Sequence, residues 1–291
     1  MHMADQAQGL RDLVLGYQQS KSRPTRVITV TSGKGGVGKS NFTLNFALTL
    51  QSRGYKVLVF DADIGLANID VLLGESPRYN LYHLLKREKT IWDIIHRSQH
   101  GLLFIAGGSG FNDLIRLKEE ELEYFVSEVN KLNGHVDYIL FDTGAGLSKE
   151  TLKFIVAADE AIVVTTPEPT SITDAYAIIK MVHNMEYRVN FRLVINRVSE
   201  PREGKQTADK ITLVAKQFLD LDIPTLGYVY DDTHVSKAVK RQVPFSLAYP
   251  NSPATRAIHE LVDGYLAERP MTGERGSGIR SFLSRMIKLI Q

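Results

Sequence analysis

The segment at residues 33–40 limits more than any other what this chain can fold into. It reads Gly-Lys-Gly-Gly-Val-Gly-Lys-Ser and fits the pattern G-x-x-x-x-G-K-[ST] of a loop that binds phosphate groups. A β-branched run at residues 27–31 precedes the loop, and a helical pattern at residues 41–53 follows it. Glycines let such a loop point its backbone N–H groups at a phosphate, and the helix N-terminus adds partial positive charge. The context therefore favours a nucleotide site over a glycine-rich turn without a ligand.

The rest of the chain repeats the same alternation of strand and helix. Further short apolar runs lie at residues 56–60, 102–106, 138–141, 160–166, 191–195 and 225–229. Helical patterns, such as those at residues 119–132 and 173–185, lie between most of these runs. This alternation predicts an α/β fold with a mainly parallel β-sheet and helices on both faces.

The composition excludes several classes of protein. The chain has 291 residues, of which 43% are hydrophobic, and this suits one large α/β domain or two small ones. It has no cysteine, which excludes disulfides and an iron–sulfur cluster held by its own thiolates. The net charge of +2 does not indicate a nucleic-acid partner, and no apolar run approaches the roughly 20 residues of a membrane-spanning helix. The N-terminus lacks the layout of a signal peptide. The absence of cysteine fits the cytoplasm, where we expect the protein.

Carboxylates stand at the ends of two predicted strands. Asp61 and Asp63 end one strand, and Asp142 ends another. Ligands of parallel sheets gather at the carboxyl ends of the strands, so these side chains are expected beside the phosphate loop. Aspartates in this position bind magnesium in nucleotide-hydrolysing proteins, although an aspartate can also simply cap a strand end.

Two lysines and a serine of the loop itself carry chemistry. Lys39 is expected to reach the β- and γ-phosphates of a nucleotide, and Ser40 is expected to bind magnesium. Lys34 stands where the pattern accepts any residue, so it is either a second functional lysine or a solvated surface lysine.

Three motifs of the chain resemble those of the MinD/ParA group, the deviant Walker A ATPases within the SIMIBI class of P-loop NTPases. They are Lys-Gly-Gly-Val-Gly-Lys-Ser at residues 34–40, Asp-Ala-Asp-Ile-Gly-Leu-Ala-Asn-Ile-Asp at residues 61–70 and Phe-Asp-Thr-Gly-Ala-Gly at residues 141–146. The resemblance extends from about residue 26 to residue 266. It implies ATP and Mg²⁺ as cofactors, hydrolysis of ATP to ADP and phosphate, and a homodimer that forms with ATP.

The resemblance also implies a role for individual residues. Lys34 would be the signature lysine, which reaches the nucleotide of the other subunit. Asp63 would orient the attacking water in switch I, and Asp61 would accompany it near magnesium. Asp142 would be the Walker B aspartate, and Asn196 would read the edge of the adenine.

These expectations give three sets of candidate site residues. The residues expected to act in catalysis are Lys34, Lys39 and Asp63. The residues expected to hold the nucleotide are Gly33, Lys34, Gly35, Gly36, Val37, Gly38, Lys39, Ser40, Asn41 and Asn196. The residues expected to bind magnesium are Ser40, Asp61 and Asp142.

Two segments depart from the family pattern. MinD itself has Ser-Pro-Ala-Gly after the Walker B aspartate, whereas this chain has Thr-Gly-Ala-Gly at residues 143–146, where Gly144 would lie in switch II. The adenine-side loop of the family usually carries a proline, whereas Tyr230 and Asp231 follow Val229 here. The resemblance therefore bears more directly on the phosphate contacts than on the base contacts.

The N-terminus resembles one branch of the family. Residues 5–11 read Asp-Gln-Ala-Gln-Gly-Leu-Arg and resemble the D-Q-A-x-x-L-R element of the flagellar MinD-like ATPases, the FlhG or YlxH group. In that group the element is a short helix that docks on the signal-recognition-type GTPase FlhF and stimulates its GTP hydrolysis. A chance N-terminal helix is the alternative. The residues expected to contact this partner are Asp5, Gln6, Ala7, Leu10 and Arg11.

The last residues form an amphipathic pattern. At 100° per residue, the apolar side chains of residues 279–291 fall within one arc of about 160°. The opposite arc carries basic and no acidic side chains, which suits a helix lying on an anionic membrane surface. The alternative is a terminal helix packed on the core of its own protein. The two placements are compatible if the helix docks on the core in one nucleotide state and is released in another. The residues expected at the membrane are Ile279, Phe282, Leu283, Met286, Ile287 and Ile290.

These patterns predict three parts of the chain. Residues 1–22 are a partner-activating segment, residues 23–268 an ATPase domain, and residues 269–291 a flexible linker with a membrane-targeting helix. The resemblance implies an ATPase switch, peripherally bound to the inner face of the cell membrane, that regulates flagellar number and placement. Its implied partners are the GTPase FlhF and, separately, flagellar basal-body proteins. Alternatives are a division-site MinD and a ParA-type DNA-partitioning ATPase. The second would require a basic patch, for which residues 237–241 are the candidate, and no nucleic acid is expected.

Overall fold

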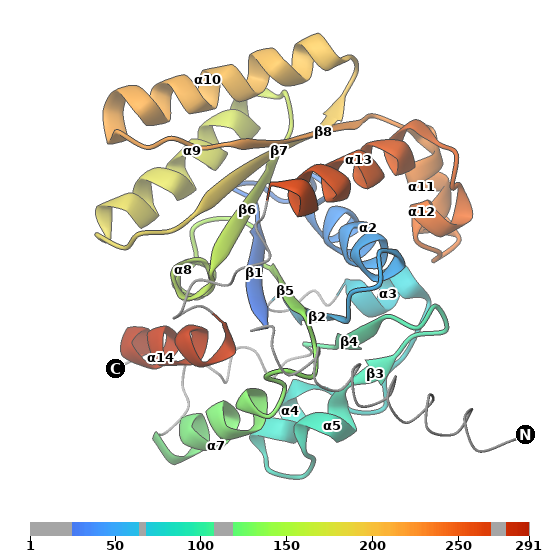
Figure 1. Ribbon diagram of the computed structural model, residues 1–291, viewed down its shortest axis with the longest axis vertical. Coiled ribbons are helices and arrows are strands. Elements are labelled where there is room, and N and C mark those ends of the chain that lie inside the picture. The colour runs from blue at the N-terminus through green and yellow to red at the C-terminus, as the bar shows by residue number, and fades with distance from the viewer. Residues whose placement is uncertain (1–24, 64–67, 108–118, 269–277, 291) are drawn as a thin grey trace, which may run out of the picture.

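The computed structural model describes residues 25–63, 68–107, 119–268 and 278–290. An eight-stranded sheet runs through the molecule in the order β3-β4-β2-β5-β1-β6-β7-β8 (Figure 1). Strand β3 is antiparallel to β4, and the other neighbouring pairs are parallel. The strands are β1 (Arg26–Thr31), β2 (Val57–Ala62), β3 (His96–Arg97), β4 (Leu103–Ile105), β5 (Tyr138–Thr143), β6 (Glu160–Thr165), β7 (Phe191–Val198) and β8 (Thr225–Tyr230). The α/β class predicted from the sequence is confirmed.

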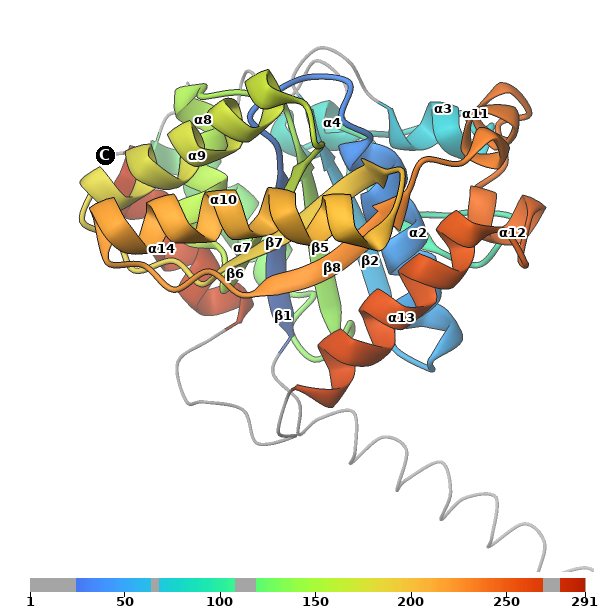
Figure 2. The ribbon, with the colours of Figure 1, turned by 90° about the horizontal axis from the view of Figure 1, so that it is seen from above.

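Helices cover both faces of this sheet, as Figures 1 and 2 show. The helices are α2 (Lys39–Ser52), α3 (Ile69–Leu73), α4 (Leu81–Leu85), α5 (Ile91–Ile94), α7 (Glu119–Asn130), α8 (Lys149–Ala157), α9 (Pro169–Asn184), α10 (Pro201–Leu219), α11 (Thr233–Lys240), α12 (Phe245–Ala248), α13 (Pro253–Ala267) and α14 (Ile279–Ile290). Helices α2 and α13 build the core on one face, and α7, α8, α9, α10 and α14 build the core on the other. The central strands are buried along almost their whole length because both of their faces are covered, and their polar side chains include Asp61 and Asp142 near the carboxyl ends.

Some boundaries differ from those predicted, each for a local reason. Helix α2 begins at Lys39 and not at residue 41, because Gly38 turns the chain directly into the helix with a φ of 92°. Helix α9 begins at Pro169 and not at residue 173, since proline is well suited to a first helical turn. Strand β1 begins at Arg26, one residue before the predicted run, and Thr25 before it is fully buried.

Helix α14 packs on the body of the protein. Ile279, Phe282, Leu283 and Met286 are buried against α7 and α8, and the ring of Phe282 stacks on Phe141 at 4.8 Å. Four of the six residues expected at a membrane therefore lie in the core, which is the alternative placement that the amphipathic pattern left open. No helix in the described ranges is long and apolar enough to span a membrane.

Candidate functional site

The phosphate loop lies between β1 and α2, at the carboxyl end of the central strand. Gly36 and Gly38 have left-handed φ angles of 80° and 92°, which residues with a side chain rarely adopt. Gly33 lies so close to α9 that an added Cβ would stand 2.2 Å from the backbone of Asp174. The backbone of Gly146, from the loop after β5, donates to the carbonyl of Ser32 at 2.8 Å. Helix α9 and the loop after β5 thus hold the phosphate loop in position.

Lys39 and Asp142 form a buried ion pair at the centre of the site. The Lys39 ammonium donates to Asp142 Oδ1 at 2.8 Å, and the hydroxyl of Thr43 donates to the same oxygen at 2.9 Å. The side chains of Lys39 and Asp142 are 6% and 0% exposed, so water screens this pair very little. The lysine also lies 3.3 Å from the hydroxyl of Ser40. Lys39, Ser40 and Asp142 are therefore assembled as the sequence predicted.

Asp61 lies beside Asp142, because the two residues are paired in the register of β2 and β5. Burial and the charge of Asp142 raise the pKa of the Asp61 carboxyl to about 7. The backbone N–H groups of Asp63, Asn68 and Ile69 donate to this carboxyl and act in the opposite direction. Asp61 and Asp142 thus bring two carboxylates together, and Lys39 supplies one positive charge beside them. The site is therefore short of positive charge.

The geometry of these side chains fits a divalent cation. Asp142 Oδ2 is buried and accepts no hydrogen bond from the part of the chain that the structure describes. A cation beside Asp61 and Asp142 would satisfy this oxygen and neutralise the second carboxylate. Within the described ranges no three histidine or acidic side chains gather as a complete metal cage, and magnesium does not need one because it keeps several waters. The residues predicted to bind magnesium therefore fit the ion.

Asp63 directly follows β2, at the position where the resemblance predicts switch I. Its Oδ2 accepts from the Asn68 side chain at 3.4 Å, and its Oδ1 lies beside Gly144, where an added Cβ would stand 3.3 Å from it. Burial raises the pKa of Asp63, and the charge of Lys39 opposes this shift. The structure thus brings the predicted switch I aspartate to the predicted switch II glycine.

Lys34 turns away from Lys39. Its ammonium donates to Glu168 at 3.1 Å and to the hydroxyl of Thr170 at 3.1 Å, both at the start of α9. The side chains of Lys34 and Glu168 are 42% and 60% exposed, so this contact is a surface ion pair of small energy. The two lysines of the loop therefore occupy different environments within one chain, which agrees with separate roles.

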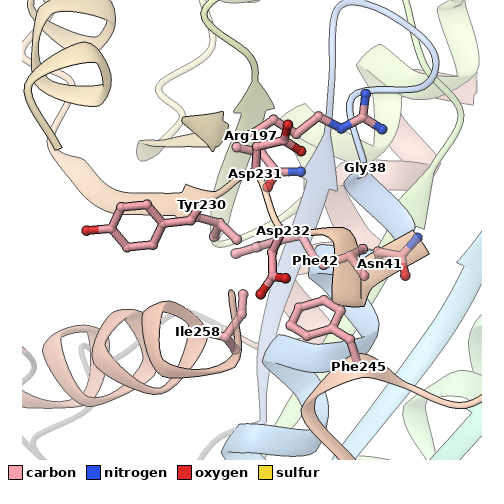
Figure 3. A pocket seen from close by; sticks show the side chains of 12 residues that line it. Gly38, Asn41, Phe42, Arg197, Tyr230, Asp231, Asp232, Phe245 and Ile258 are labelled. Carbon is pink, nitrogen blue, oxygen red and sulfur yellow. The ribbon is translucent and has the colours of Figure 1, made fainter. Parts of the chain in front are cut away.

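A small cavity lies beside the N-terminus of α2, at the ends of β7 and β8 (Figure 3). Phe42, Phe245 and Ile258 supply apolar walls that suit a planar base, whereas Tyr230 points outward. The side-chain amide of Asn196 donates to the carbonyl of Val37 at 2.7 Å. Asn196 therefore ties the phosphate loop to β7, beside the cavity where the resemblance predicts the adenine.

Sequence reasoning missed several residues of this site. Thr43 follows Lys39 by one helical turn, so helical spacing could have placed it beside the same ligand. Glu168 and Thr170 stand in a polar stretch directly after β6, at the same edge of the sheet. The candidate partner residues Asp5, Gln6, Ala7, Leu10 and Arg11 lie outside the described residues.

The chain is similar to several known proteins over most of its length. A family model named ParA, described as "NUBPL iron-transfer P-loop NTPase", matches residues 23–266. The flagellum site-determining protein YlxH of Helicobacter pylori is 39% identical, with 91% of each chain covered. The antiactivator FleN of Pseudomonas aeruginosa is 33% identical, over 93% of this chain and 96% of FleN. The structure of the septum site-determining protein MinD of Pyrococcus horikoshii, complexed with Mg-ADP, is 25% identical with a TM-score of 0.68, covering 84% of this chain and 97% of that one.

Proposed function

This chain belongs to the ParA/MinD family of P-loop NTPases, and on that premise we propose that it is an ATP-dependent dimeric switch that controls flagellar number and placement. The buried arrangement of Lys39, Asp142 and Asp61 beside the phosphate loop is the observation that carries the enzymatic part. The two relatives named for flagellar site determination and antiactivation, 39% and 33% identical, support the biological part. The family model describes iron transfer, but this chain has no cysteine to hold an iron–sulfur cluster.

Each group of the site has a task in this proposal. Lys39 binds the β- and γ-phosphates, which replace Asp142 as its partner, and Asn196 holds the loop to the base pocket. Magnesium, held by Ser40, Asp61 and Asp142, supplies charge neutralisation for the phosphates. Asp63 orients the attacking water. Lys34 leaves Glu168 and reaches the nucleotide of a second copy.

Helix α8 connects the nucleotide site to the tail. It begins directly after the switch II loop, with Ser148 as its N-cap, and its other end lies under α14. The ring of Phe154 in α8 lies 6.2 Å from that of Phe282 in α14. A shift of switch II towards a γ-phosphate would move α8 and loosen the seat of α14. The released helix would then bind an anionic membrane at the inner face of the cell, with its basic arc towards the headgroups.

The N-terminal segment is proposed to act on a partner GTPase. A synthetic peptide covering residues 4–17 should accelerate GTP hydrolysis by an FlhF-type GTPase several-fold, and Gln6→Ala or Arg11→Ala should reduce the effect. A polar side chain on a mobile peptide can complete a partner's site by positioning water or neutralising phosphate charge. A scrambled peptide of the same composition is the control. If neither peptide nor full-length protein stimulates the GTPase, this assignment fails and only the ATPase switch remains.

A further inference from the structure

The side chain of Asp159 joins three separate parts of the chain. Asp159 stands between α8 and β6, and its carboxylate is largely buried, with 10% of the side chain exposed. Its Oδ2 accepts from the backbone N–H of Val27 in β1 at 3.0 Å and from that of Gly278 at 3.1 Å. Its Oδ1 accepts from the guanidinium of Arg285 in α14 at 3.1 Å.

Asp159 thereby caps helix α14 from a distant point of the sequence. Gly278 directly precedes α14, and its N–H is one of the donors that a helix start leaves without an intrahelical partner. A carboxylate at a helix N-terminus is also favoured by the helix dipole. The same carboxylate thus holds the residue directly before the tail helix and the side chain of Arg285, nearly two turns further on.

Arg285 completes the connection from the side of the tail. Its Nε donates to the carbonyl of Ala157, the last residue of α8, at 2.9 Å, while its Nη2 donates to Asp159. The guanidinium therefore satisfies a carbonyl at a helix C-terminus and a carboxylate at once, through two fixed directions that a lysine cannot reproduce. Its side chain remains 34% exposed, so it is accessible to other anions.

We propose that Asp159 and Arg285 form the latch that keeps α14 docked, and that Arg285 exchanges Asp159 for a phosphate of an anionic lipid when the helix is released. This inference rests on the proposed membrane function, and it assigns the control of helix release to Asp159 and Arg285. The apolar face of α14 supplies most of the contact area but would be satisfied equally by a membrane. The latch is polar, and among the described residues it supplies side-chain hydrogen bonds of α14 that a neutral apolar environment could not replace.

The arrangement predicts where the tail pivots. Arg192 in β7 binds Glu160 and Glu268, and Tyr265 donates to Glu160 at 2.9 Å, so the end of α13 is tied to the sheet by a second polar network. Breaking the latch frees the chain from Gly278 onwards and leaves α13 in place. Release therefore changes the position of the tail and leaves the ATPase core folded.

The test compares full-length variants in the ADP-bound state. Arg285→Lys keeps the positive charge but loses the two directed hydrogen bonds, and Asp159→Asn removes the charge of the latch. Asp263→Asn, which breaks an exposed ion pair with Arg53, is the matched control. Hydrogen exchange of the amides of residues 279–290 reports docking without a membrane. Co-sedimentation with phosphatidylglycerol vesicles, phosphatidylcholine vesicles and a sodium phosphate control reports the exchange of partner.

We expect both latch variants to raise amide exchange in α14 about tenfold, the range that losing a charge-assisted hydrogen bond brings, while Asp263→Asn leaves it unchanged. Both should bind phosphatidylglycerol vesicles in ADP, and neither should respond to phosphatidylcholine. Arg285→Gln should show the same exchange but weaker vesicle binding than Arg285→Lys. Arg285→Lys is the sharper variant, because Asp159 also accepts from Val27 and Arg285 does not contact that residue. Unchanged amide exchange in Arg285→Lys would overturn the latch, even if the wild-type protein binds vesicles. If exchange rises but the wild type never binds vesicles with ATP, the membrane function fails and the latch on the docked helix stands.

Discussion

Lys34 and Lys39 are separated by five positions, but their side chains differ in exposure and in the carboxylate that they bind. Lys39 is buried on Asp142, whereas Lys34 is partly exposed and held by Glu168 on the surface. A lysine buried against a carboxylate can bind a phosphate held by the same chain, because the phosphate can replace the carboxylate as its partner. A lysine on the surface can leave its partner at little energetic cost and reach another molecule.

The first prediction concerns these two lysines. Lys39→Ala should weaken ATP binding by at least tenfold, because it removes a phosphate contact and leaves Asp142 buried without its cation. Lys34→Ala should bind ATP within about twofold of the wild type, yet fail to dimerise and to hydrolyse ATP. Isothermal titration with ATP measures binding, size-exclusion chromatography with ATP measures dimerisation, and a phosphate-release assay measures hydrolysis. Equal loss of binding in both variants would disprove a role of Lys34 across the dimer.

The second prediction concerns Asp61 and pH. Its folded pKa of about 7 lies above the ordinary value of 3.8 for an aspartate. The contribution of this group to stability is therefore complete below about pH 4 and is lost as the pH rises through about 7. Asp61→Asn should therefore stabilise the nucleotide-free protein at pH 8 by about 1–4 kcal/mol, and by less at pH 5. Urea unfolding of both proteins at the two pH values measures the difference. A difference independent of pH would contradict the assigned cause.

At the scale of elements, the sequence predicts best where one local pattern dominates. The phosphate loop, the seven longer strands and the amphipathic helix at residues 279–290 all carry such a pattern. Strand β3 is two residues long and has no period to detect, and it exists only because β4 offers it an edge. The contact of Lys34 with Glu168 joins residues 134 positions apart, which no local pattern encodes. Nor can the amphipathic pattern of α14 tell a protein core from a membrane, because both bury an apolar face.

The third prediction concerns the energy of docking α14. Deleting residues 279–291 should lower the free energy of unfolding by roughly 3–6 kcal/mol, because the apolar side chains buried by the helix outweigh the entropy of ordering it. The same deletion should abolish binding to anionic vesicles and leave ATP affinity unchanged. Phe282→Asp should lose both the stacking on Phe141 and membrane binding. Thermal unfolding and co-sedimentation measure these effects, and a tail deletion as stable as the wild type would refute the docking.

In the whole molecule, the nucleotide site and the latch lie at opposite ends of the parallel strands. The nucleotide site lies where β1, β2 and β5 end, and the latch at Asp159 lies where β1 and β6 begin. Strand β1 and helix α8 each run from one end to the other. Dimerisation would place two released tails on one particle, and the gain in effective concentration can raise vesicle affinity by roughly 10²–10⁴-fold over a single tail.

We propose that the γ-phosphate of ATP drives dimerisation, and Asp63→Ala separates dimerisation from hydrolysis. Only water positioning should be lost in this variant, so it should bind ATP, hydrolyse it at least tenfold more slowly, and accumulate as a dimer. Size-exclusion chromatography with light scattering, in ATP and in ADP, measures its mass. We predict twice the 32.6 kDa of the chain in ATP and a single chain in ADP. A protein that stays monomeric with ATP demonstrably bound would contradict the account.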